Sequence, residues 1–353
     1  MSASHVANAS YAVYVANAKD ASITLLHLDS DAETLTTVDS YSSDAKPGPI
    51  VFSADGSTLY SATRGDESIS SYRIDPHNGE LTSVARTRIG AGLVYLTLTP
   101  NQRFAVGTSY SDHKLVVVRT ADLDQPSATP VAEVEGINRA HSVVVSPDGN
   151  FLYVASLGDD KLHGFRISDE GSLEALPPVT VAEGFGPRHQ VISSDGRTLY
   201  VVSEFLAQVA RFAIDPASGT LSLEKISPRF DALEGLKPGF ADAADSEQGT
   251  AGLIWAADLH LAESQGYLFV SDRTSSQLIG VDLDLNEVSA APTETQPRAF
   301  DISGDGRFAV GCGEQSTEAA LYRVEASNGA LTPLAKAAVG QGPDWVAILP
   351  LGR

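Results

Sequence analysis

The chain has 353 residues, and its 45 acidic against 24 basic side chains give a formal net charge of −21 at pH 7. Such a charge argues strongly against nucleic acid or an anionic membrane as a partner. The single cysteine, Cys312, rules out an intramolecular disulfide framework, and no stretch approaches the ~20 apolar residues of a membrane-spanning helix. Residues 1–16 lack the basic start and long apolar run of a signal peptide, so we expect a cytoplasmic protein.

The N-terminal part of the chain reads as an incomplete structural unit. Short runs at residues 11–17, 22–28 and 35–40 predict three strands, and no strand precedes them. Residues 345–349, near the C-terminus, have the pattern of the missing strand. We therefore expect strands from both ends of the chain to share one sheet.

The central part of the chain is repetitive. The segment His-Ser-Val-Val-Val-Ser-Pro-Asp-Gly at 141–149 is echoed at 188–196 and again at 298–306. The turn residues of successive repeats are Asp55, Asn101, Asp148 and Asp195, at spacings of 46, 47 and 47 residues, followed by Gln265 after 70 and Asp305 after 40 more. Self-similarity at such a period indicates a propeller or a solenoid.

Each repeat predicts four antiparallel strands. In the unit that starts at His141, short runs at 143–146, 151–155, 162–167 and 172–181 are bounded by turn signals. The long spacing holds residues 228–250, which are rich in Asp, Ala, Gly and Glu and predict an inserted surface loop. The prediction is an all-β, seven-bladed β-propeller in one domain, residues 1–353, closed by the N- and C-terminal strands. Closure removes exposed sheet edges.

Known cofactor signatures are missing from the sequence. There is no helix-period segment of useful length, which excludes Rossmann and barrel folds, and no phosphate-binding glycine loop, GxSxG, HExxH or CxxC motif. We therefore expect no cofactor and no metal.

Antiparallel pairing places the start of a unit's first strand and the end of its second strand at the same face. Counting seven residues back from each turn selects one ring of residues: Gly48, Val94, His141, Arg188, Asp258 and Arg298, with Asp344 from the final strand. Counting nine forward selects a second ring: Arg64, Tyr110, Leu157, Glu204, Thr274 and Glu314, with Arg273 just before Thr274. Five consecutive ionisable residues in the first ring predict an anion-binding pocket at one mouth of the channel, rather than a solvated rim.

Several short motifs in these strands resemble the seven-bladed lactonase family, which includes the cycloisomerase-type 6-phosphogluconolactonase and the carboxy-muconate lactonizing enzyme. They are Ala-His-Ser at 140–142, Gly-Pro-Arg-His at 186–189, Ser-Glu at 203–204, Trp-Ala-Ala-Asp-Leu-His at 255–260, Ser-Asp-Arg-Thr at 271–274, Thr-Glu-Thr-Gln-Pro-Arg at 293–298 and Val-Gly-Gln-Gly-Pro at 339–343. The resemblance implies the opening or closing of a lactone on a small carboxylated, sometimes phosphorylated acid. Gly48-Pro49 and Leu93-Val94 depart from the family pattern, which leaves the substrate open.

Lactone hydrolysis needs a base to activate water and a donor to stabilise the oxyanion. His141 is the candidate base, and Glu204 either orients it or acts as the base itself. Arg188 is the candidate donor next to the reacting carbonyl. The predicted substrate-binding residues are Arg273, Arg298, Asp258, His260, Tyr110 and Asp344. A histidine inside a strand, such as His189 or His260, is also typical of a hydrogen bond to the neighbouring blade.

The function favoured at this stage is metal-free hydrolysis of 6-phosphogluconolactone, with a small anionic lactone as the partner and an oligomeric state that the sequence does not reveal. The alternatives are a muconate-type cycloisomerase, a lactonase for an unphosphorylated aldonolactone, and a propeller that only binds protein. A metal-dependent lactonase is a further alternative, with the hard cation held by Asp258, Asp344, Glu204 and Glu314.

Overall fold

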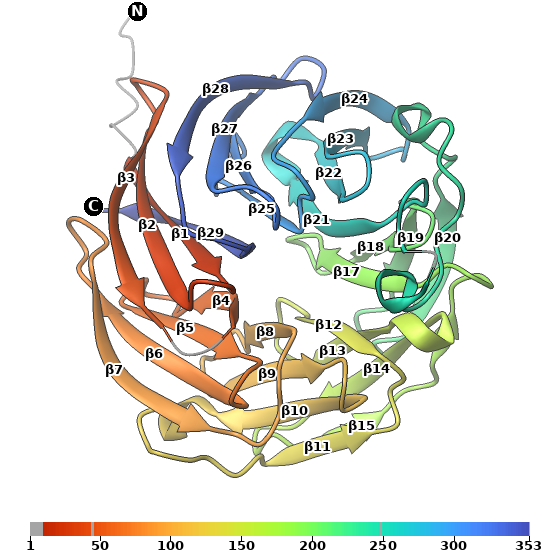
Figure 1. The fold of residues 1–353 in the computed structure, drawn as a ribbon. Coiled ribbons are helices and arrows are strands. Elements are labelled where there is room, and N and C mark those ends of the chain that lie inside the picture. Colours follow the sequence, from red (N-terminus) through yellow and green to blue (C-terminus); the bar gives the residue numbers. More distant parts are fainter. Residues whose placement is uncertain (1–9, 44–45, 248, 353) are drawn as a thin grey trace, which may run out of the picture.

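The computed structural model describes residues 10–43, 46–247 and 249–352. Seven antiparallel sheets stand around a common axis, which confirms the predicted seven-bladed propeller (Figure 1). Residues 1–9 of the segment analysed for a signal peptide lie outside the described residues. Among the residues that are described, no helix is long and apolar enough to cross a membrane.

Six blades are built from consecutive strands. In chain order the strands of these blades are β4 (Pro47–Phe52), β5 (Thr58–Thr63), β6 (Ser68–Ile74) and β7 (Leu81–Arg88); β8 (Tyr95–Leu98), β9 (Phe104–Ser109), β10 (Lys114–Arg119) and β11 (Ala132–Glu135); β12 (Ala140–Val145), β13 (Phe151–Ser156), β14 (Lys161–Ile167), β15 (Leu173–Ala175) and β16 (Val179–Thr180); β17 (Pro187–Ile192), β18 (Thr198–Ser203), β19 (Val209–Ile214) and β20 (Leu221–Ile226); β21 (Ala256–Ala262), β22 (Tyr267–Asp272), β23 (Gln277–Asp282) and β24 (Glu287–Pro292); and β25 (Ala299–Ile302), β26 (Phe308–Cys312), β27 (Glu318–Val324) and β28 (Leu331–Ala338).

The remaining blade closes the ring with strands from both ends of the chain. Its order is β29 (Pro343–Leu351), β1 (Ser10–Asn17), β2 (Ser22–Asp29) and β3 (Thr34–Ser42), with Tyr14 paired to Ala347. This confirms the predicted closure. The first strand of each blade contacts the first strands of its neighbours, so these strands line the axis of the ring.

The single strand predicted at residues 172–181 is wrong, because this segment is interrupted. Residues 172–181 form two short strands, β15 and β16, which both pair with β14. Pro177 and Pro178 lie between them. Proline has no backbone N–H to donate to a sheet, so the ladder breaks there.

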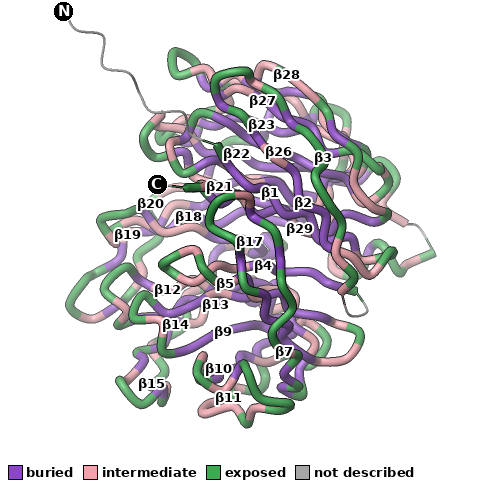
Figure 2. Tube along the Cα trace, turned by 90° about the vertical axis from the view of Figure 1, so that its left-hand side faces the viewer, coloured by how far each residue is buried: buried purple, intermediate pink, exposed green. Residues whose placement is uncertain are grey.

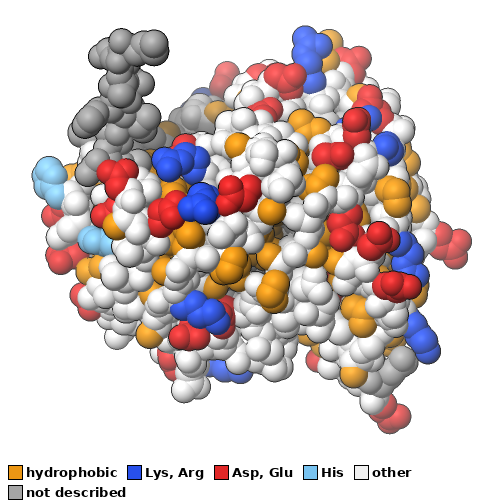
Figure 3. Space-filling view, turned by 90° about the horizontal axis from the view of Figure 1, so that it is seen from above, with side chains coloured by type: hydrophobic (Ala, Val, Ile, Leu, Met, Phe, Trp, Pro, Cys, Tyr) orange, Lys and Arg blue, Asp and Glu red, His pale blue; other side chains and the backbone are white. Residues whose placement is uncertain are grey.

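Apolar side chains fill the spaces between adjacent blades. One such cluster joins Tyr14 and Leu25 of the closing blade to Ile50, Leu59 and Tyr72 of the next blade. The inner strands of the blades are therefore mostly buried, whereas the loops and outermost strands such as β3 and β7 are largely exposed (Figure 2). On the outside, acidic side chains are spread over the face shown in Figure 3, as the net charge of −21 requires.

The described helices are all single 3₁₀ turns of three residues: η1 (Thr120–Asp122), η2 (Leu157–Asp159), η3 (Asp231–Leu233), η4 (Ala243–Asp245) and η5 (Glu263–Gln265). Two of them, η3 and η4, lie within residues 228–250, between β20 and β21. We refer to residues 228–250 below as the insertion.

Candidate active site

The innermost strands bring most of the first ring of residues to one small, tightly packed pocket on the axis, with an empty volume of about 210 Å³. Its lining consists of Val94, His141, Arg188, His189, Arg298, Asp344 and Trp345. Gly48 borders the same group, because a Cβ atom there would lie 3.2 Å from Oδ2 of Asp344. Asp258 and the second ring lie just behind this lining, as the following contacts show.

Local irregularities of the strands aim these side chains. The pairing register shifts between Ala140 and Ser142, between Pro187 and Gln190, and between Ala256 and Leu259, in each case at the start of an innermost strand. Bulges of this kind bend a strand and re-aim its side chains, often beside active sites. The second shift lets both Arg188 and His189 line the pocket, although they are adjacent in sequence.

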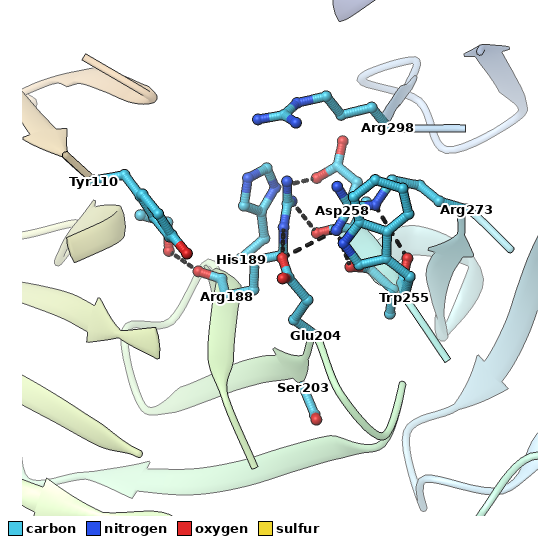
Figure 4. A network of polar contacts seen from close by, with 12 residues as sticks. Tyr110, Arg188, His189, Ser203, Glu204, Trp255, Asp258, Arg273 and Arg298 are labelled. Carbon is cyan, nitrogen blue, oxygen red and sulfur yellow. Dashed lines mark hydrogen bonds and ion pairs between the residues drawn. The ribbon is translucent and has the colours of Figure 1, made fainter. Parts of the chain in front are cut away.

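Arg188, Glu204 and Arg273 form a buried group that we call the inner cluster (Figure 4). Oε2 of Glu204 accepts hydrogen bonds from Nε of Arg188 at 2.8 Å and from Arg273 at 3.0 Å. These hydrogen bonds of Glu204 thus go to two arginines and not to His141, while its alternative role as the base stays a prediction. A buried carboxylate needs a cation as its partner. The two guanidinium groups are charged and the His141 imidazole is neutral, so Glu204 pairs with the arginines.

Backbone carbonyl groups complete the support of both arginines. Arg273 donates to the carbonyl oxygen atoms of Trp255 and Ala256 at 3.1 Å each, and Arg188 donates to that of Ala257. The guanidinium of Arg273 also lies 3.6 Å from the centre of the Trp255 ring. Trp255 is thus a stacking platform for an arginine, an arrangement that adds a cation–π attraction.

Burial and the nearby Arg273 lower the pKa of Arg188 to about 9, while Glu204 opposes the shift. Arg188 therefore remains a cation at neutral pH. Its side chain is fixed by the inner cluster and lines the pocket, which is the arrangement required of a preorganised donor to a developing oxyanion.

A second ion-pair group also contributes to the lining. Asp344 accepts from Nε of Arg298 at 2.7 Å and from Arg64 at 2.6 Å, and Arg298 lies 3.5 Å from Glu314. Figure 4 shows the guanidinium of Arg298 extending toward Arg188 and His189. Asp344 raises the pKa of Arg298, although burial opposes this, so the group is a permanent cation.

His141 is almost fully buried, and its Nδ1 atom has no hydrogen-bond partner among the described residues. Its ring lies 5.3 Å from that of His189 and 5.9 Å from that of Tyr110, between ring centres. Burial, together with the positive charge of Arg188, holds the pKa of His141 well below its usual value. At neutral pH the imidazole is therefore neutral, and its unpartnered Nδ1 atom is buried beside the pocket.

His189 is a candidate that the sequence analysis did not select. Its Nδ1 donates to Asp258 on the neighbouring blade at 2.5 Å, and its other ring nitrogen remains for the pocket that it lines. Burial lowers the pKa of His189 to about 4, although Asp258 opposes the shift, so the ring is neutral. The Gly-Pro-Arg-His motif was the available signal, but only the bulge turns both of its last two residues to the pocket.

His260, predicted to bind substrate, is not part of this lining. It lies between Asp258 and Asp301, at 3.3 Å from each carboxylate, with its ring 4.7 Å from that of Phe300. Two residues along a strand displace a side chain by about 6.6 Å, so His260 lies farther along the strand than Asp258. Although burial opposes it, the charge of Asp258 raises the pKa of His260 to about 9.

Asp258, also predicted to bind substrate, pairs with two histidine side chains. Besides His189 and His260, it accepts from the backbone N–H groups of Leu259 and Phe300. Burial opposes ionisation, yet the charge of His260 keeps the pKa of Asp258 well below its usual value. Asp258 is therefore a fixed anion that orients His189.

Carboxylates near the pocket are committed to protein cations. Glu204 and Asp344 bind arginines and Asp258 binds histidines, as described above, while Glu314 lies beside Arg298. Among the described residues, no group of three or more His, Cys, Asp or Glu side chains is placed to hold a metal ion.

Comparisons with known proteins agree with this architecture. A family model described as "Lactonase, 7-bladed beta-propeller" matches residues 6–348. The chain is 30% identical to a 6-phosphogluconolactonase of Pectobacterium atrosepticum, over 96% of this chain and 98% of that protein, and 32% identical to a 6-phosphogluconolactonase of Enterobacter sp., over 95% and 98%. A periplasmic gluconolactonase of Pseudomonas aeruginosa superposes with a TM-score of 0.81 at 24% identity, over 97% of this chain and all of that one. At this identity the last likeness concerns the fold alone.

Proposed function

The chain belongs to the seven-bladed β-propeller lactonase family, and on this premise we propose that it hydrolyses 6-phosphogluconolactone to 6-phosphogluconate. The full-length relatives that carry this name support the choice of substrate. The observation that carries the proposal is the unpartnered Nδ1 of buried His141 in a pocket that also presents Arg188.

In the proposed first step, Nδ1 of His141 takes a proton from a water molecule as the water oxygen attacks the lactone carbonyl carbon. The carbonyl oxygen becomes negatively charged, and the guanidinium of Arg188 donates hydrogen bonds to it. Because Glu204 already holds Arg188 in place, little reorganisation is needed when the charge develops.

In the second step, the bond between the carbonyl carbon and the ring oxygen breaks. The imidazolium of His141 returns its proton to that oxygen, which becomes the hydroxyl group of the product. Burial and nearby arginines hold the pKa of His141 low, so its imidazolium gives up this proton readily. The new carboxyl group ionises and leaves near the cations of the pocket.

His189 is the competing base. Its Nδ1–H is bonded to Asp258, which fixes the tautomer and aims the other ring nitrogen, as in catalytic dyads built on histidine and a carboxylate. Single substitutions, His141→Ala and His189→Ala, separate the two: loss of the base lowers kcat, whereas loss of a packing residue lowers stability.

The test is a lactone panel assayed with and without a chelator. We expect turnover of 6-phosphogluconolactone to exceed that of glucono-δ-lactone and to persist in the chelator. Turnover confined to the unphosphorylated lactone, or to carboxy-muconate, would overturn the proposed substrate. Activity lost to the chelator and restored by a divalent ion would overturn the metal-free mechanism. The cytoplasmic location stays a prediction.

A further inference from the structure

A polar contact at the outer edge of the pocket connects the insertion to two other blades. The carboxylate of Asp242, in the insertion, accepts from the Tyr110 hydroxyl at 3.0 Å and from Nε of Arg139 at 3.2 Å, and a second Arg139 nitrogen donates to its other oxygen. We call Tyr110, Arg139 and Asp242 the rim cluster. Tyr110 packs its ring edge-on against His141, so the rim cluster adjoins the reacting groups.

The insertion is anchored where it passes the inner cluster. The N–H of Gly239 donates to the carbonyl oxygen of Phe205 at 2.8 Å, directly after Glu204, and Lys237 pairs with Leu253. A Cβ atom on Gly239 would lie 2.4 Å from the carbonyl oxygen of Ile254, so only glycine permits this approach. The anchoring delivers Asp242, three residues later, to the edge of the pocket.

Both charged residues of the rim cluster have left-handed backbone conformations, with φ of 52° at Arg139 and 58° at Asp242. Side-chain-bearing residues adopt this region at a cost, and such residues gather at ligand clamps and active sites. Arg139 also lies two positions before His141. Arg139 and Asp242 are two of the thirteen non-glycine residues with positive φ among the described residues, and these two meet through their side chains.

We propose that Tyr110 and Arg139 form the subsite for the anionic group of the substrate remote from the lactone carbonyl, a phosphate, and that the Asp242 carboxylate fills this subsite until the phosphate displaces it. This inference rests on the proposed function and names the residues that would make the enzyme select a phosphorylated lactone. A phosphate would accept from the same two donors that Asp242 uses, with three oxygen atoms instead of two.

The ion pairs of the other arginines favour the rim cluster, rather than the inner pocket, as the place where a phosphate binds. Arg188 and Arg273 are bonded to buried Glu204, and Arg298 to buried Asp344, so a ligand that displaced these carboxylates would leave an unpaired buried charge. Asp242 is 43% exposed and can move into water, because exposed ion pairs contribute little. The rim cluster is thus the place where one anion can replace another.

The first experiment measures binding of inorganic phosphate by isothermal titration calorimetry at low ionic strength. We expect Arg139→Gln to weaken binding at least tenfold, and Asp242→Asn to strengthen it about fivefold by removing the competing carboxylate. The matched controls are Arg211→Gln and Glu224→Gln, an exposed pair at 3.0 Å with similar exposure on another blade, for which no change is expected. Equal phosphate affinity in all five proteins would overturn the subsite.

The second experiment measures the ratio of kcat/KM for 6-phosphogluconolactone to that for glucono-δ-lactone. Arg139→Gln should lower this ratio tenfold or more through KM, and Arg211→Gln should leave it unchanged. An unaltered ratio in Arg139→Gln, in an enzyme whose wild type is active, would overturn the inference and leave the proposed function intact. A wild type that binds phosphate as predicted but hydrolyses no phosphorylated lactone would overturn the function instead.

Discussion

Two arginine–carboxylate pairs border the same pocket and differ mainly in burial. In the inner cluster, the Arg188 and Glu204 side chains are 1% and 11% exposed, whereas in the rim cluster those of Arg139 and Asp242 are 25% and 43% exposed. A buried pair is costly to break, because separation leaves a charge without water or a partner. An exposed pair is cheap to exchange. The proposed mechanism therefore has its rigid catalytic groups in the interior and its replaceable contacts at the rim.

This difference in burial matches two separate tasks in lactone hydrolysis, which are stabilising the oxyanion and recognising a remote part of the substrate. Groups that meet the developing oxyanion gain from being fixed beforehand, since they need not reorganise during the reaction. Groups that recognise a remote part of the substrate must release their own partner as the substrate arrives. The ring of His141 contacts both His189, which bonds to Asp258, and Tyr110 of the rim cluster, so the groups proposed for the two tasks both adjoin His141.

The largest effect is expected at the interior. His141→Ala should lower kcat/KM by roughly 10²–10⁴, mainly through kcat, because it removes the proposed base that activates water. Since the pKa of His141 lies well below its usual value, the acid limb of the wild-type kcat/KM profile should have its midpoint below about 6.5. Kinetics over pH 4–9 check both points. A variant with normal kcat, or an acid limb above pH 7, would remove His141 from the mechanism.

The second prediction compares the two carboxylates directly. Glu204→Gln should lower the free energy of unfolding by about 3 kcal/mol, because Arg188 and Arg273 lose their buried counter-charge. Asp242→Asn should change it by less than about 1 kcal/mol, because the rim pair is exposed to solvent. Urea denaturation of both variants makes the measurement, and Glu204→Asp serves as the charge-conserving control. Equal losses in the two variants would contradict the distinction between interior and rim.

The smallest effect is expected for His260 and concerns the pH dependence of stability. The folded-state pKa of His260, about 9, lies above the ordinary value near 6.5, so its charged form stabilises the fold fully below pH 6.5 and loses this contribution as pH rises through 9. His260→Gln should therefore be less stable than the wild type by about 2 kcal/mol at pH 6, and the gap should close by pH 10. Thermal unfolding across this range tests the sign, and a gap that widens with pH would contradict it.

The propeller could be predicted because its signals are local and repeated. Turn residues such as Asp148 and Asp195 recur at a nearly constant spacing, and alternating short strands follow each of them. The closing strand was found for the same reason, from the pattern of residues 345–349. The one strand that failed, 172–181, contains two prolines whose missing N–H groups break the ladder.

The site was predicted only as a set of positions. Counting along the strands selected His141, Arg188, Glu204 and Arg298, because strand register is a property of the sequence. It did not reveal that Glu204 serves arginines instead of His141, since that choice depends on which blades meet and on how deeply each group is buried. Nor did it select His189, whose place in the lining depends on a bulge.

The amino-acid sequence by itself determined the number of blades, the closure of the ring and the register that gathers ionisable groups at one mouth, because these depend on periodic, short-range patterns. Tertiary structure alone decided which charges became partners, that His189 joined His141 in the pocket lining, and that Asp242 reached across to Tyr110 and Arg139. Electrostatic pairing depends on distance and burial in space, and residues more than 100 positions apart acquire both only when the ring is closed.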